Sequence, residues 1–328
     1  MSAEPESNSA ELLEEIPEEP GALVPLLLFF ATVWSVFHAG ALLSAKDAPA
    51  GALFGFFNVR FLLTGAPFAL PLLSILVVHE FGHYAAARFH RLPSSLPYFI
   101  PLPLLGLFGT LGALIGMRDE IRSRNGLLDV GASGPLAGFV VALPVLIWGL
   151  LHSTFQPLLA SGYTQEGSSL LYVGLKYALL GPTPAGQDLE LHPTALAGWT
   201  GLFLTMLNLF WWGQLDGGHI AYALLGERHH RIARWSRRAL LLLFAYNLLR
   251  FVVPVLLGQS QLGLRQALSN SSFWLIWFVV LQLIERFSGE GEHPPFEPGP
   301  LSRGRKLVGW FCIALFALLF MPTPIALY

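Results

Sequence analysis

Two histidines and a glutamate form the strongest chemical signal in this chain. Residues 79–83 read HEFGH, which places His79 and His83 four residues apart. On a helix this spacing puts both imidazoles on one face, one turn apart, where their neutral nitrogens can bind one zinc ion. Glu80 lies off that face and can hold a water molecule at the metal and remove its proton. The segment therefore predicts a hydrolytic zinc site with Glu80 as its catalytic base.

A catalytic zinc ion needs a third protein ligand, because three ligands leave one position open for water. We predict Asp216, which lies in NLFWWGQLDGGH at the end of a long apolar stretch. Gly217 and Gly218 follow it and allow a helix to break there and a substrate to approach closely. His219 is a rival ligand. The other interpretation is that it is a helix-end histidine bonded to backbone or water.

The composition places these residues in a membrane. Apolar residues make up 54% of the 328 residues and charged residues 12%, about half the ~25% charged share of soluble domains. A charged side chain at the centre of a membrane helix costs about 2.5–3.5 kcal/mol. A metal ion compensates Glu80 there, and polar contacts with neighbouring helices are the alternative. A net charge of −2 excludes nucleic-acid binding as a function class, and the single cysteine, Cys312, cannot form an internal disulfide.

Seven apolar runs approach or exceed the ~20 helical residues that cross a bilayer. The sixth is short, and the fourth is long enough to tilt or break. The runs cover about 22–45, 63–88, 127–151, 196–225, 239–258, 272–286 and 307–327. We therefore predict an all-α polytopic membrane protein with about six to seven transmembrane helices.

Basic residues indicate the orientation of these helices. Fourteen Lys and Arg follow the second, fourth and sixth runs, and five lie elsewhere. Because cytoplasmic loops retain Lys and Arg, we expect a cytoplasmic N-terminus. Residues 1–20 carry seven glutamates and no Lys or Arg, and we interpret them as a disordered acidic cytoplasmic tail that precedes a transmembrane domain over 21–328.

The segment after the HEFGH helix breaks the helical pattern. Residues 93–117 are apolar but contain four prolines and four glycines, which disrupt helices. We predict an irregular or extended re-entrant segment there, buried in protein or lining a wet cavity. Residues 152–195 form a polar excursion on the opposite side.

Three motifs together resemble the site-2 protease family of intramembrane metalloproteases. They are HEFGH, GASGPLAG at 131–138 and NLFWWGQLDGG at 208–218, and the resemblance covers about residues 60–225. It implies one zinc ion per chain, bound by His79, His83 and Asp216, with Glu80 as catalytic base. It also implies that a membrane-associated segment before residue 131 engages the substrate.

Other motif residues are less specific. Asn208 matches a family asparagine that is expected to bond the substrate or the developing oxyanion, and a helix–helix contact is its alternative. Trp211, Trp212 and Gly213 replace prolines found in many relatives, which leaves the local loop geometry open. Gly134 and Gly138 predict close helix packing, and the adjacent His229 and His230 are expected to be solvated.

We therefore expect a zinc endopeptidase that cleaves in or near a transmembrane segment of another membrane protein, as in regulated intramembrane proteolysis. One alternative is a prenyl-protein-type membrane endopeptidase, against which Asp216-Gly217-Gly218 argues. The other is a non-catalytic metal-binding transporter or scaffold, against which Glu80 argues. A transmembrane protein substrate and the lipid bilayer are the expected partners. A bacterial inner membrane is the expected location, with a eukaryotic internal membrane as the alternative, and the oligomeric state is open.

Overall fold

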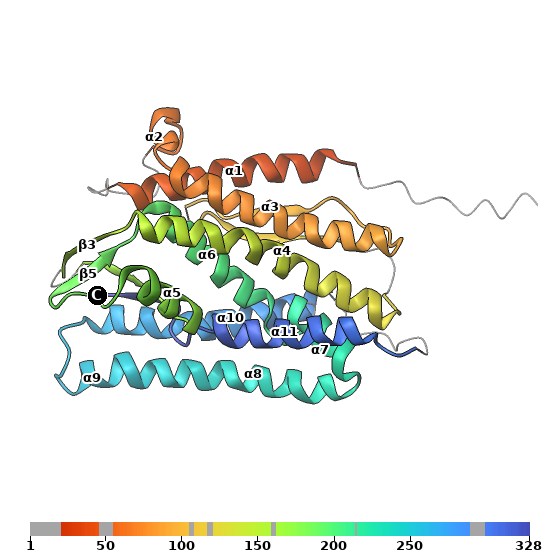
Figure 1. The fold of residues 1–328 in the computed structure, drawn as a ribbon. Coiled ribbons are helices and arrows are strands. Elements are labelled where there is room, and N and C mark those ends of the chain that lie inside the picture. The colour runs from red at the N-terminus through yellow and green to blue at the C-terminus, as the bar shows by residue number, and fades with distance from the viewer. Residues whose placement is uncertain are drawn as a thin grey trace, which may run out of the picture.

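The computed structural model describes residues 21–45, 55–104, 108–116, 121–158, 162–213, 215–288 and 299–328. The predicted acidic tail, residues 1–20, lies outside this set. Long helices run side by side in a bundle (Figure 1). The helices are α1 (Leu23–Ser44), α2 (Val59–Leu63), α3 (Ala66–Phe89), α4 (Arg124–Leu151), α5 (Leu170–Leu180), α6 (Pro193–Asn208), α7 (Asp216–Leu225), α8 (Arg228–Asn247), the π-helix η1 (Leu248–Val252), α9 (Val253–Leu256), α10 (Leu264–Ser288) and α11 (Arg303–Leu319).

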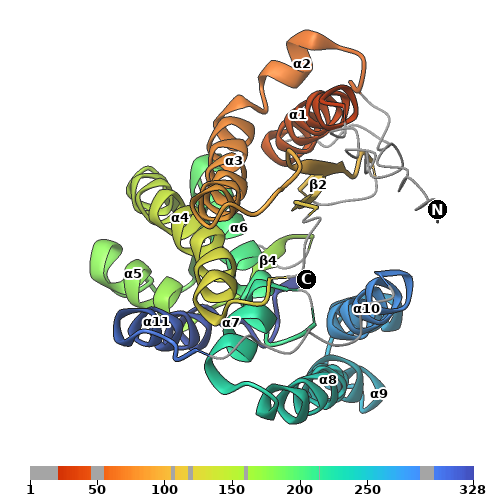
Figure 2. The same cartoon turned by 90° about the vertical axis from the view of Figure 1, so that its right-hand side faces the viewer.

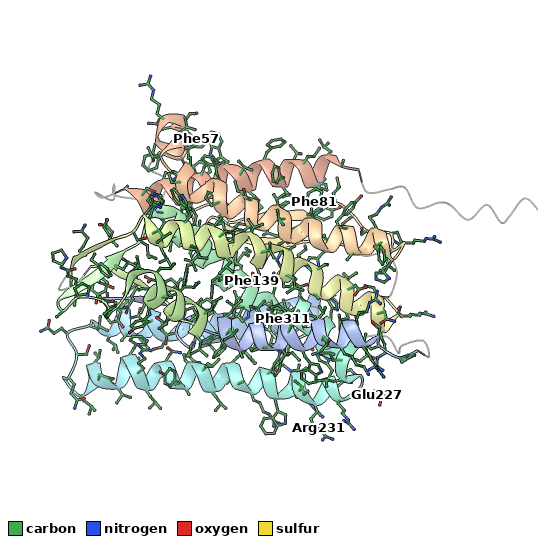
Figure 3. The ribbon with its side chains drawn as sticks, viewed as in Figure 1. Phe57, Phe81, Phe139, Glu227, Arg231 and Phe311 are labelled. Carbon is green, nitrogen blue, oxygen red and sulfur yellow. The ribbon has the colours of Figure 1, made fainter. Side chains whose placement is uncertain are left out.

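Four helices of the described residues are long and apolar enough to cross a membrane. They are α1, α3, α4 and the continuous run α8–η1–α9 over Arg228–Leu256. They correspond to the first, second, third and fifth predicted runs and identify a multi-pass membrane protein. Large apolar side chains cover the outside of the bundle, among them Phe81 and Phe311 (Figure 3). The predicted total of six to seven transmembrane helices is not established by the structure.

The fourth predicted run is divided into two helices. Helix α6 ends at Asn208, and α7 begins at Asp216. A Cβ atom on Gly217 would overlap the carbonyl of Leu209, so this close approach of backbone to backbone requires glycine. The break therefore places Asp216 at the start of a new helix.

Aromatic side chains hold the turn between these helices. Trp211 packs against Phe316 of α11, and Trp212 packs against Phe278 of α10. The guanidinium of Arg237 lies 5.7 Å from the centre of the Trp212 ring. Trp211 and Trp212 therefore anchor this turn to the C-terminal helices.

The described part of the chain also contains strands, which the all-α prediction did not include. The strands are β1 (Tyr98–Pro101), β2 (Thr110–Leu114), β3 (Thr154–Pro157), β4 (Thr164–Glu166), β5 (Gln187–Glu190) and β6 (Ile325–Leu327). They form three two-stranded antiparallel sheets, β1–β2, β3–β5 and β4–β6. Proline and glycine interrupt the helices in these regions, and strand pairing then satisfies the exposed backbone groups.

The paired strands β1 and β2 lie within the segment predicted to be extended. Tyr98 pairs with Leu114 and Phe99 with Ala113. Strand β1 packs on α1, where Phe29 makes an edge-to-face contact with Phe99. The extended backbone is thus confirmed, whereas its re-entrant path through a membrane stays a prediction.

Helix α4 packs against both α3 and α6, which also contact each other (Figure 2). Small residues allow this close approach: a Cβ on Gly82 of α3 would lie 2.6 Å from the carbonyl oxygen of Ser133 in α4. Where α6 packs on α4, a Cβ on Gly198 of α6 would lie 2.6 Å from the Cα of Leu146. The end of α3 and the starts of α4, α8 and α11 share one end of the bundle (Figure 1), which carries the three basic connections.

Candidate zinc active site

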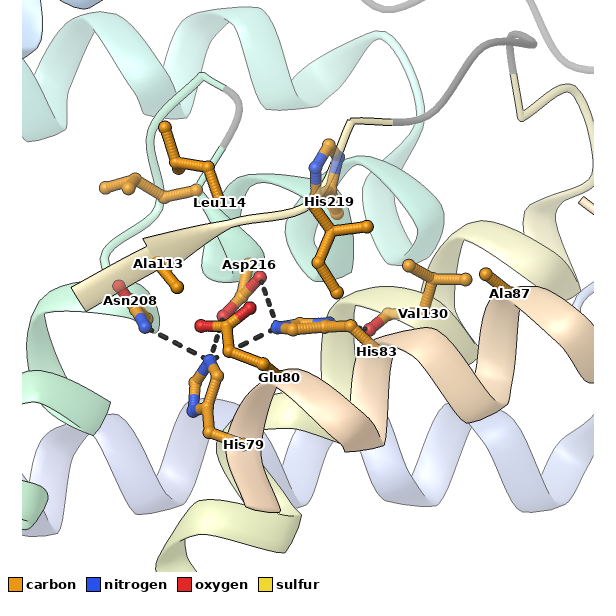
Figure 4. Close-up of a pocket in the computed structure, with 12 residues that line it drawn as sticks. His79, Glu80, His83, Ala87, Ala113, Leu114, Val130, Asn208, Asp216 and His219 are labelled. Carbon is orange, nitrogen blue, oxygen red and sulfur yellow. Dashed lines mark hydrogen bonds and ion pairs between the residues drawn. The ribbon is translucent and has the colours of Figure 1, made fainter. Parts of the chain in front are cut away.

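The three predicted ligands meet at one point. His79 and His83 project from α3, and Asp216 approaches from the first residue of α7 (Figure 4). The Nε2 atoms of the two histidines lie 3.2 Å apart. The Asp216 carboxylate lies 3.4 Å from Nε2 of His79 and 3.3 Å from Nε2 of His83. Among the described residues, these three form a group able to hold a metal ion.

The spacing of these atoms fits zinc. Two ligand atoms that each lie about 2.0–2.2 Å from a tetrahedral zinc ion are about 3.3–3.6 Å apart. The three observed separations of 3.2, 3.3 and 3.4 Å are close to that range. Three converging protein ligands also match the number in catalytic zinc sites.

The hydrogen bond of His83 gives an independent argument for a cation. Its Nδ1 lies 2.7 Å from the carbonyl oxygen of Val130, which can only accept, so Nδ1 carries the proton. In the neutral ring, Nε2 then has a lone pair, which faces the carboxylate of Asp216 at 3.3 Å. These two acceptors repel each other unless a proton or a metal ion lies between them. The Val130 bond also fixes the tautomer that a metal ligand needs.

Glu80 lines the same cavity without belonging to the ligand group. Its side chain is buried, and the cavity, of about 110 Å³, is bounded by α3, α4, α6, α7 and the hairpin. From strand β2, Ala113 and Leu114 close one side (Figure 4). The carboxylate of Glu80 is thus available for proton transfer at the metal position.

Asn208 also faces the ligands. It is the last residue of α6, and its Nδ2 lies 3.2 Å from Nε2 of His79. The contact joins two helices, as the structural interpretation expected, and it also places an amide donor in the cavity. Both interpretations of Asn208 therefore stay open on geometry.

Three glycines of α4 make room for the site. A Cβ on Gly134 would overlap the imidazole of His83, and one on Gly138 would lie 3.1 Å from Nδ1 of His79. A Cβ on Gly131 would lie 3.1 Å from the carbonyl oxygen of Asp216. The sequence predicted only helix packing for Gly134 and Gly138. Gly131, Gly134 and Gly138 share one face of a helix by their spacing, and this pattern in the sequence could have indicated a surface without side chains beneath the ligands.

Other histidines lie outside the ligand group. His219 lines the cavity from α7 but is not one of the three converging residues. The expectation that His229 is solvated is wrong, because this residue is 3% exposed and packs against Tyr222. His90, for which no role was predicted, lies 2.7 Å from Asp129. Helix α8 begins at Arg228, so His229 lies in a packed helix and not in a solvated loop, which explains its burial.

Comparison with known proteins identifies related sequences. The profile of peptidase family M50 matches residues 67–251, more than half of the chain. "Probable zinc metalloprotease EGY2, chloroplastic" from Oryza sativa subsp. indica is 34% identical over 175 residues, which are 53% of this chain and 32% of that protein. "Probable zinc metalloprotease EGY1, chloroplastic" from Arabidopsis thaliana is 29% identical over 240 residues, 66% of this chain and 43% of that protein.

The matched relatives are longer proteins. The aligned part of this chain spans 32% of the length of the EGY2 relative and 43% of the length of the EGY1 relative. No solved structure gives a significant match.

Proposed function

The chain belongs to peptidase family M50, and we propose that it is a zinc endopeptidase that cleaves a peptide bond in or near a transmembrane segment of another membrane protein. The observation that carries the proposal is the convergence of His79, His83 and Asp216 within 3.2–3.4 Å beside the buried Glu80. The zinc metalloprotease names of the relatives support the choice of metal. Four apolar helices of spanning length support a site inside the bilayer.

The residues divide the chemistry among them. His79, His83 and Asp216 would hold the zinc ion, which when bound lowers the pKa of water and polarises a carbonyl group. Glu80 accepts a proton from the attacking water and then delivers it to the leaving amine. Asn208, from α6, is placed to donate a hydrogen bond to the substrate carbonyl as negative charge develops on its oxygen.

Strand β2 is the proposed contact for the substrate backbone. A transmembrane helix has its amides already bonded and must unwind locally before attack. In the described residues the hairpin has only two strands, so β2 offers a second edge for an added strand. Ala113 and Leu114 line the cavity that contains Glu80, which would place such a strand beside the ligands.

Cross-linking tests this docking mode. Leu114→Cys in an inactive Glu80→Gln background is expected to form a disulfide with a substrate cysteine near the cleavage site. Leu114 is 63% exposed, whereas the one native cysteine, Cys312, is buried. Leu242→Cys on α8, at a position 70% exposed, is the control and should form no such bond. Equal cross-linking from both positions would exclude β2 as the docking strand.

The membrane in which the protein works is part of the proposal. The bacterial inner membrane expected from the sequence has no support from the relatives, whose names place them in chloroplasts. Those names fit the alternative, an internal membrane of a eukaryotic cell. The N-terminus is proposed to face the side that carries the three basic connections.

A comparison of cells tests the function itself. Membrane proteins from cells with the native chain and with Glu80→Gln should differ by a trimmed fragment that only the native chain produces. Zinc chelation of native membranes should remove the same fragment. Cleavage confined to prenylated peptides would favour the prenyl-protein endopeptidase, and identical fragments in both cells would favour a metal-binding scaffold or transporter.

A further inference from the structure

Three helices meet in an ionic cluster at the basic end of the bundle. Arg305, in the first turn of α11, donates from Nε and Nη2 to the carboxylate of Asp129 in α4 at 2.9 and 2.7 Å. Nε2 of His90, the C-cap residue of α3, lies 2.7 Å from the same carboxylate. One carboxylate therefore joins α3, α4 and α11, and we call Arg305, Asp129 and His90 the clasp.

A second contact docks α11 on the same face of α4. The backbone N–H of Ser302 donates to the side chain of Asn125 at 3.1 Å, and the Ser302 hydroxyl caps α11 by accepting from the N–H of Arg305. Asn125 and Asp129 are four residues apart and so share one face of α4. The start of α11 is thus fixed to α4 at two adjacent points.

The clasp lies next to a ligand of the proposed metal site. Asp129 directly precedes Val130, whose carbonyl accepts the Nδ1 proton of His83. His83 and His90 are seven residues apart on α3, which is about two helical turns, so they share one face. Along this face α3 therefore contacts α4 at consecutive residues, through His83 to Val130 and through His90 to Asp129.

We propose that Arg305 and Asp129 are positioning residues that hold the Val130 carbonyl in register with His83 and thereby set the affinity of the site for zinc. The inference rests on the zinc site proposed above. A shift of α4 along α3 would weaken the bond that fixes the His83 tautomer and ring orientation, on which metal affinity depends. The forked guanidinium opposes such a shift, because its paired bonds fix direction as well as distance.

Helix α11 lies outside the part of the chain that the family profile matches. The profile of family M50 ends at residue 251, and Arg305 lies beyond it. A helix outside the matched region is therefore proposed to tune a ligand inside it. The side chains of Arg305 and Asp129 are 31% and 26% exposed, so water only partly screens this ion pair.

Zinc affinity measured by competition with a chromogenic chelator tests the proposal. Arg305→Gln and Asp129→Asn are each expected to raise the zinc dissociation constant about tenfold, the lower end of the effect of partners that orient metal ligands. The zinc dissociation constant of the double variant should rise about tenfold rather than a hundredfold, because the two changes remove the same interaction. The absorption spectrum of the cobalt-substituted protein should change in the same variants.

Lys176→Gln is the control. Lys176 of α5 forms an ion pair with Glu166 of β4 at 3.6 Å, and these side chains are 25% and 16% exposed. Neither α5 nor β4 lines the cavity, so the loss of this pair should leave zinc affinity within roughly twofold, while thermal denaturation measures its effect on stability in parallel.

The outcomes separate this inference from the proposed function. If the native protein binds no stoichiometric zinc, the zinc protease proposal fails. If the native protein binds zinc and the clasp variants bind it equally well, or if Lys176→Gln weakens binding as much, the positioning role is wrong and the protease proposal stands. Should one clasp variant fail to fold, the other decides the result.

Discussion

Replacing Asp216 with alanine is expected to remove zinc from the purified protein and to abolish proteolysis. The carboxylate lies 3.4 and 3.3 Å from the two imidazole Nε2 atoms and is the proposed third ligand. Its loss should raise the zinc dissociation constant by more than about 100-fold, since the loss of a group that only orients a ligand already costs 10–100-fold. Metal analysis by atomic absorption after dialysis measures the effect.

Asp188→Ala provides the control for this experiment. Asp188 lies in β5 and bonds the backbone N–H of Leu189, with no place in the cavity. It should retain one zinc ion per chain and native cleavage. An Asp216→Ala protein with a full zinc content would show that the three residues do not form the proposed ligand set.

Glu80→Gln is expected to give the opposite combination, a normal zinc content without cleavage. Glutamine keeps the size of the buried side chain but cannot accept the proton of the attacking water. The cleavage rate should fall by roughly 10²–10⁴-fold, the usual contribution of a general acid–base group. Single-turnover cleavage of a transmembrane substrate in lipid nanodiscs, with metal analysis of the same sample, measures both quantities.

The two variants together distinguish the ligand set from the base. Glu80 lines the cavity but is not part of the group that can hold a metal, so its replacement should leave affinity within about twofold of native. Glu190→Gln, in β5 and outside the cavity, is the matched control and should cleave at the native rate. Native cleavage by Glu80→Gln would mean that another group removes the proton.

The local part of the site follows from the sequence alone. Helical periodicity depends only on neighbouring residues, so the four-residue spacing of His79 and His83 already places both imidazoles on one face. Composition likewise indicates membrane helices, because apolar length and low charge do not depend on how the helices pack. The break after Asn208 could also be anticipated, since Gly217 and Gly218 weaken a helix wherever they occur.

The packing of distant segments was decided by the tertiary structure. No periodicity predicts that Val130 presents its carbonyl to His83, or that Gly134 lies beneath the same ring. Proline and glycine indicated where helices stop, but the pairing of β1 with β2 depends on the surface of α1 against which they pack.

The sequence by itself determined which residues can bind a metal and that they lie in a membrane protein, because residue type and helical spacing are local properties. Only the tertiary structure brought Asp216 to the two histidines and Arg305 to Asp129, 176 residues away along the chain. Contacts at such separations depend on which helix faces meet, and many pairings are compatible with one pattern of apolar residues. The close approach of α3, α4 and α7 selects one of them.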